Sequence, residues 1–194
     1  MPQITRDSLM TLEAYSRARS EFRARVMAHK KHRTVGLGEH VTLIFEDELT
    51  IRYQIQEMLR AERIFEDEGI QGELDAYNPL VPDGANWKAT MMIEYPDVEE
   101  RQRMLGKLIG IEARVWIAVA GHPRVHAVAD EDLERQNETK TSAVHFLRFE
   151  LEPAMVRALK AGAGLGMGVD HPAYSATVAV DDAAHRSLVN DLEG

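Results

Sequence analysis

The sequence predicts an α+β fold, with a long N-terminal helix and a helical pair packed on a mostly antiparallel sheet. Two observations lead to this prediction. Up to residue 77, apolar residues recur at the spacing of a helix face, whereas most later segments alternate apolar and polar residues as half-buried strands do. Helices followed by strands are typical of the α+β class. A chain of 194 residues is long enough for one sizeable core, so we expect a single domain over 1–194.

The first predicted helix starts at Thr5, a favourable N-cap, and Asp7 lies in its first turn near the positive end of the helix dipole. It continues to "MAHKKHR", and Gly36 and Gly38 end it. Its apolar positions recur at helical spacing: Leu9, Leu12, Tyr15, Phe22 and Val26.

The remaining elements follow from the same two periodicities. A short strand is expected at 41–46, and helices are expected at 48–64, 66–77, 97–108, 153–160 and 182–191. The second of these ends before Asn78-Pro79, because a residue before proline avoids the α conformation. Further strands are expected within 88–95, 114–129, 142–151 and 165–180. The polar stretch 130–140 is predicted to be a mobile loop.

Composition excludes several classes of protein. The chain has 23 basic and 32 acidic residues, a net charge of −9, which argues against nucleic acid and anionic membranes as main partners. "MPQITRDSLM" is neither a signal peptide nor a membrane span, so a cytoplasmic location is expected. Without cysteine there is no disulfide and no cysteine-ligated iron–sulfur cluster. Iron, manganese or zinc would therefore need His, carboxylate or backbone oxygen ligands.

An unusual feature is a run of acids within 57–80. On one continuous helix over 51–77, Glu62, Glu66 and Glu73 share the face of the apolar residues Ile51 and Ile55. A carboxylate that is buried without a partner costs several kcal/mol, so each must be paired, bound to metal or protonated.

Three interpretations of these acids remain open. The first, which we favour because structural ion pairs outnumber functional acids, is a ladder of ion pairs with Arg19, Arg23 and Lys30 of the first helix. The second is a metal site for iron, manganese or magnesium, although the Glu-x-x-His signature of di-iron bundles is absent. The third is a general acid/base site with a raised pKa.

Two histidines are candidate ligands for such a metal site. In "SAVHFLRFEL", alternation places His145 on the apolar face of a strand, where a hydrogen-bonded core histidine is the commoner outcome. In "VDHPAY", His171 follows Asp170 at a strand end, where a turn is the simpler interpretation. A metal site would combine Glu62, Glu66 or Glu73 with His145 or His171.

Glycines alternate through "AGAGLGMGVD", without matching a nucleotide-binding motif. Alternate glycines leave one strand face bare, so another backbone, an aromatic ring or a ligand can approach closely. Packing is the simplest interpretation. A small-molecule site beside Gly164 and Gly166 is the alternative.

Four segments, "RYQIQEMLRAERI", "ELDAYNPL", "TSAVHFLRFEL" and "DHPAY", together resemble the bacterial domain of unknown function 3501 family. The resemblance runs nearly the full length of the chain. Genes of that family commonly lie beside one for a rubrerythrin-like di-iron protein and one for an iron–sulfur oxidoreductase. The resemblance therefore implies an accessory role in a redox or peroxide-handling system, an associational argument that names no mechanism.

Two hypotheses about function follow. The first is a non-enzymatic accessory protein that docks onto such a redox partner, with Lys30, Lys31 and Arg33 as the docking patch. The second is a metal-binding protein or metal-dependent oxidoreductase built on the carboxylates and histidines named above. No motif in the chain specifies a substrate or a reaction.

Overall fold

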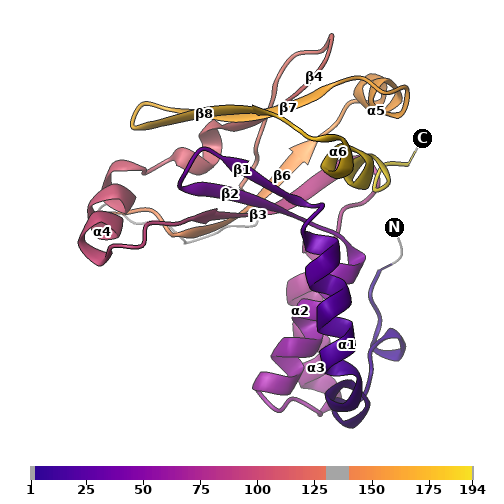
Figure 1. Cartoon of the computed structure of the whole chain (residues 1–194). Coiled ribbons are helices and arrows are strands. Elements are labelled where there is room, and N and C mark those ends of the chain that lie inside the picture. Colours follow the sequence, from indigo (N-terminus) through magenta and orange to yellow (C-terminus); the bar gives the residue numbers. More distant parts are fainter. Residues whose placement is uncertain (1–2, 130–139, 194) are drawn as a thin grey trace.

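The computed structural model describes residues 3–129 and 140–193, and two four-stranded antiparallel sheets form its centre (Figure 1). The first sheet has the order β1-β2-β3-β6, with strands Thr34–Leu37, Val41–Glu46, Asn86–Ile93 and Val144–Glu150. The second has the order β5-β4-β7-β8, with strands Val125–His126, Val115–Val119, Leu165–His171 and Tyr174–Ala179. The predicted α+β class is confirmed, and the strand pairs are antiparallel throughout the described residues.

The main core lies between the two sheets. Trp87 and Met91 of β3 belong to the same buried apolar cluster as Ile117 of β4 and Met167 of β7. At one edge the sheets are joined by a β-bridge between Val128 and Arg148. At the opposite edge, the Tyr174 hydroxyl donates a hydrogen bond to the carbonyl of Leu37. The sandwich is therefore tied along both sides.

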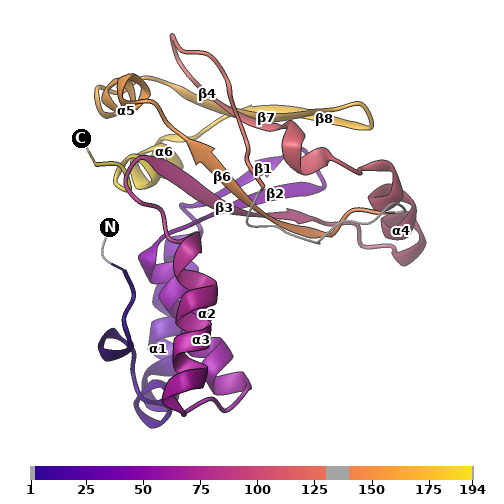
Figure 2. The same cartoon turned by 180° about the vertical axis from the view of Figure 1, so that it is seen from behind.

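Helices α1 (Leu12–Lys30), α2 (Glu48–Ala61) and α3 (Asp67–Tyr77) form a helical arm that projects away from the sheets (Figures 1 and 2). The arm has two apolar clusters of its own. One contains Tyr15, Phe22, Val26 and Tyr53, and the other contains Ile4, Ile51, Ile55, Leu59, Leu74 and Leu80. The arm thus has a core of its own, and Phe146 of β6 packs against the second of these clusters.

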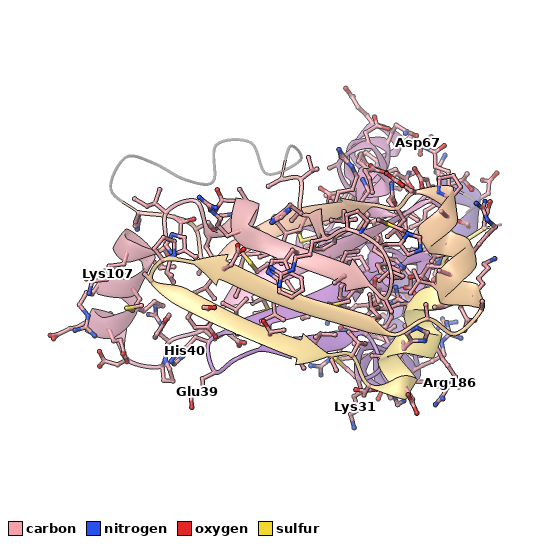
Figure 3. All side chains as sticks on the ribbon, turned by 90° about the horizontal axis from the view of Figure 1, so that it is seen from above. Lys31, Glu39, His40, Asp67, Lys107 and Arg186 are labelled. Carbon is pink, nitrogen blue, oxygen red and sulfur yellow. The ribbon has the colours of Figure 1, made fainter. Side chains whose placement is uncertain are left out.

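The other α-helices in the described part of the chain are α4 (Val98–Lys107), α5 (Pro153–Lys160) and α6 (Asp182–Val189). Viewed onto the second sheet, Lys107 of α4 and Arg186 of α6 lie at opposite ends of the molecule (Figure 3). None of the described helices combines the length and apolarity needed to cross a membrane.

Most predicted elements occur at the predicted places, but the N-terminus differs. Thr5 caps only a 3-10 turn at Arg6–Ser8, and α1 begins at Leu12 because the side chain of Thr11 accepts a hydrogen bond from the Ala14 amide. Strand β1 was not predicted, since Gly36 within it suggested only a helix stop. The predicted loop at 130–140 lies outside the described residues apart from Lys140.

Candidate functional site

The structure separates the acids that were predicted to share a core-facing stripe. Glu62 and Glu66 are exposed, and Glu73 is half-buried in a groove where Tyr77 and Phe146 are its neighbours. The core-facing position predicted for Glu62 and Glu66 is therefore wrong.

The cause is a turn between α2 and α3. Helix α2 ends at Ala61, and Arg63 adopts a left-handed conformation with φ of 56°. The chain then restarts at Glu66, which is the N-cap of α3. The continuous helix on which the stripe depended does not exist, so its register is lost at this turn.

The two candidate histidines belong to different sheets. His145 on β6 is 1% exposed, and its Nε2 lies 2.9 Å from Thr141 Oγ1 and 3.0 Å from the Ser142 carbonyl oxygen. His171 ends β7, where its Nδ1 accepts from the Ala173 amide and its Nε2 contacts the Ile109 carbonyl. Both rings thus make ordinary hydrogen bonds within the fold.

Across residues 3–129 and 140–193, no three His, Asp or Glu side chains gather where they could hold a metal ion. Glu62, Glu66, Glu73, His145 and His171 therefore do not form one group in this part of the chain, and a site for iron, manganese or zinc stays a prediction.

An ion pair between α1 and α2 does form, but with a different acid. Arg19 donates from Nε and Nη2 to the two carboxylate oxygens of Glu57, both at 2.8 Å. Tyr15, one turn earlier on α1, donates its hydroxyl to the same carboxylate at 2.6 Å. The sequence did not identify Glu57 because helical periodicity places it off the apolar face of α2. In the structure, the side of α2 that carries Glu57 borders α1.

These contacts fix the charge states of Glu57 and Tyr15. The hydrogen bonds from Arg19 lower the pKa of the Glu57 carboxyl from 4.5 to about 2. Burial, and then the hydrogen bond to Glu57, raise the pKa of the Tyr15 phenol. At neutral pH the first group stays ionised and the second stays protonated, so neither is suited to proton transfer.

Beside this pair lies an open groove of about 510 Å³ between α1 and α2, which we call the arginine groove. It is lined by Ser16, Arg19, Ser20, Arg23, Ala24, Met27 and Arg60. Arg23 and Arg60 form no salt bridge within 4.0 Å of a described carboxylate, although Arg60 is close enough to Glu57 to help lower its pKa. Their guanidinium groups, with the serine hydroxyls, offer hydrogen-bond donors to an anion.

Only part of the docking patch expected at the end of the first helix lies on the surface. Lys31 is exposed and Lys30 is half-buried, but Arg33 is only 1% exposed and forms a buried ion pair with Asp191. The exposed positive charge of this helix therefore lies mainly along its length. The spacing of Arg19 and Arg23, one turn apart on α1, is the sequence signal that both line the arginine groove.

Comparison with known proteins identifies the family of the chain and a similar crystal structure. The model of the family "Protein of unknown function (DUF3501)" matches residues 3–192. A crystal structure of a novel protein of unknown function from Burkholderia pseudomallei K96243 is 56% identical, with a TM-score of 0.94, and the match covers 99% of this chain and 100% of that chain. No curated protein matches the chain.

Proposed function

The chain belongs to the DUF3501 family of proteins of unknown function, and we propose that it is a non-enzymatic docking protein that binds an acidic partner protein through the arginine groove. The observation that carries the proposal is a pair of guanidinium groups, Arg23 and Arg60, that line one groove from two helices without a salt bridge to a described carboxylate.

The charge distribution supports this role. The chain as a whole carries −9, so an exposed cluster of arginines on its arm stands out against an acidic background. Complementary potentials steer two proteins together and select against wrong partners. Arginine is also enriched at the energetic centres of protein interfaces, where its planar group binds carboxylates with two hydrogen bonds.

The cluster of Arg19, Glu57 and Tyr15, of which Arg19 lines the arginine groove, supports binding over catalysis. Glu57 is held ionised by Arg19, and the Tyr15 phenol is held protonated. A general acid or base works best with a pKa near the working pH, and neither of these groups has one.

The partner class rests on the family resemblance. It points to a rubrerythrin-like protein or an iron–sulfur oxidoreductase as the docked protein, and to the cytoplasm as the place where they meet. We therefore propose that the chain serves a redox or peroxide-handling system as an accessory.

Co-expression and affinity capture test the proposal. The double variant Arg23→Glu/Arg60→Glu should reduce recovery of the rubrerythrin-like protein or the oxidoreductase at least about tenfold, because repulsion replaces attraction at the groove. Recovery by the wild type should also fall as salt rises above about 0.15 M.

The matched control is Arg17→Glu. Arg17 lies on the same helix, but its side chain is 77% exposed and pairs with Glu13 outside the groove. It should leave recovery unchanged. Equal losses in the control and in the double variant would point to net charge and not to this groove, and the proposal would fail. Recovery that is unaffected by all three substitutions would also reject it.

A further inference from the structure

A second cavity lies at the tip of the helical arm, away from the arginine groove. Its volume is about 560 Å³, within the range of small-molecule sites. Most of its lining is apolar: Leu9, Met10, Leu12, Leu59, Ile64, Phe65 and Ile70, with Arg6, Asp7 and Thr11 as the polar members. Phe65 is 68% exposed, which is unusual for so large an apolar side chain.

One wall of this cavity is an N-terminal strap, residues 3–11, that is fastened at two points. The side-chain amide of Asn78 bonds the amide and the carbonyl of Ile4, at 3.0 and 2.9 Å. The side-chain amide of the fully buried Gln56 accepts from the Met10 amide at 2.7 Å and donates to the Met10 carbonyl at 3.3 Å. The strap residues that line the cavity lie between these two points or directly beside the second one. The wall is thus held in place independently of any ligand.

The opposite wall depends on the strained turn at Arg63. A non-glycine residue in the left-handed region costs about 1–2 kcal/mol, and such strain is found disproportionately at functional sites. The turn places Ile64 and Phe65 at the cavity. Gly69 makes room for Ile64, because a Cβ there would lie 2.7 Å from the Ile64 methyl group.

From these observations we propose that the cavity at the arm tip is a binding site for a small, uncharged, largely apolar molecule. The ligand would lie between the strap and the α2–α3 turn and would cover the exposed ring of Phe65. This site is distinct from the arginine groove, and the inference does not depend on the docking function.

The charges around the cavity decide the ligand class. Arg6 is the cationic member of the lining, and it already pairs with Asp67 of α3, with Nη1 to Oδ2 at 2.8 Å. Asp7 adds a carboxylate to the same rim. A ligand carboxylate would therefore find Arg6 already paired and would be repelled by Asp7. An uncharged molecule avoids this repulsion and has no charge to desolvate when it enters the cavity.

Nile red, an uncharged dye whose emission shifts to the blue in apolar surroundings, is a direct probe. The wild-type chain should bind it saturably with one site. Ile70→Trp, which fills the cavity, should weaken binding at least about tenfold. Phe65→Ser, which removes an exposed ring and leaves the buried core intact, should weaken it about threefold or more.

The matched control is Val98→Ser on α4, another exposed apolar residue, 54% exposed, far from the arm tip. It should bind the dye as the wild type does. Absence of saturable binding by the wild type would overturn the proposal, as would affinity that is unchanged in both cavity variants. If Phe65→Ser reduced capture of a protein partner while the wild type bound no dye, the cavity would be a protein interface and the proposal would again be wrong.

Discussion

Arg33 and Asp191, 158 residues apart in the chain, meet in the protein interior as a two-pronged ion pair. Arg33 Nη1 lies 3.1 Å from Asp191 Oδ1, and Nη2 lies 2.5 Å from Oδ2. The guanidinium also donates to the carbonyls of Phe45 and Glu46 at the end of β2 and to Ser187 on α6. The pair thus fastens the C-terminal helix to the first sheet at the point where the helical arm begins.

Replacing Asp191 by alanine should destabilise the fold by about 3 kcal/mol, because it leaves a buried guanidinium without its main counterion. Asp47, 3.6 Å from Arg33 Nε, offers only partial compensation. Urea denaturation measures the loss. Asp182→Ala is the control, since that carboxylate is exposed at the start of α6, and its effect should stay within about 0.5 kcal/mol. Equal midpoints for the two variants would contradict this role of the pair.

Gly168 should tolerate no side chain, whereas Gly166 should tolerate alanine. A Cβ at Gly168 would lie 2.3 Å from the Trp116 ring and 2.7 Å from the Ala176 carbonyl oxygen. At Gly166 the nearest atom would be 3.6 Å away, an ordinary contact. Gly168→Ala should therefore cost about 1–3 kcal/mol, and Gly166→Ala less than about 1 kcal/mol. Thermal unfolding checks both, and a stable Gly168→Ala variant would show that the Trp116 ring can move aside.

The strands were largely predictable because their signal is local. Alternation in "HVTLIFE" and "SAVHFLRFEL" fixes which residues face the core, and His145 lies on the buried face as that pattern required. The alternate glycines predicted a bare strand face that an aromatic ring could approach closely. The Trp116 ring packs against Gly168 in this way, so this part of the prediction is confirmed. Each of these features depends on a few neighbouring residues.

The candidate site was less predictable because it depends on how helices pack. The turn at Arg63 contains no glycine or proline, so the helical periodicity of apolar residues gives no sign of a break there. The acids were therefore assigned to the face of a continuous helix that does not exist. Glu57 pairs with Arg19 only because α2 presents that side to α1. Likewise, Arg33 was expected at the surface, and its partner Asp191 lies too far along the chain for spacing to suggest it.

The strain at Arg63 gives a simple test of the turn. Glycine adopts the left-handed region without penalty, and the Arg63 side chain is exposed, so Arg63→Gly should stabilise the protein by about 1 kcal/mol. Arg60→Gly, one turn earlier inside α2, should instead destabilise it by about 1 kcal/mol. Opposite signs in urea denaturation support the left-handed geometry. A loss of stability in both variants would contradict it.

The Glu57–Arg19 ion pair predicts how the arm responds to acid. A carboxyl whose pKa is lowered on folding, here from 4.5 to about 2, stabilises the folded state above its unfolded pKa and loses that contribution as pH falls between these values. Glu57→Gln should therefore cost about 1–2 kcal/mol at pH 7, after allowance for solvent screening of a side chain that is 25% exposed. The difference from wild type should shrink toward zero as pH falls from about 5 to 2 in urea titrations. Glu62→Gln is the control, because that carboxylate is exposed, and its loss should change the stability at pH 7 by less than about 0.5 kcal/mol. A constant difference between Glu57→Gln and wild type at every pH would mean that lost packing, and not lost charge, explains the effect.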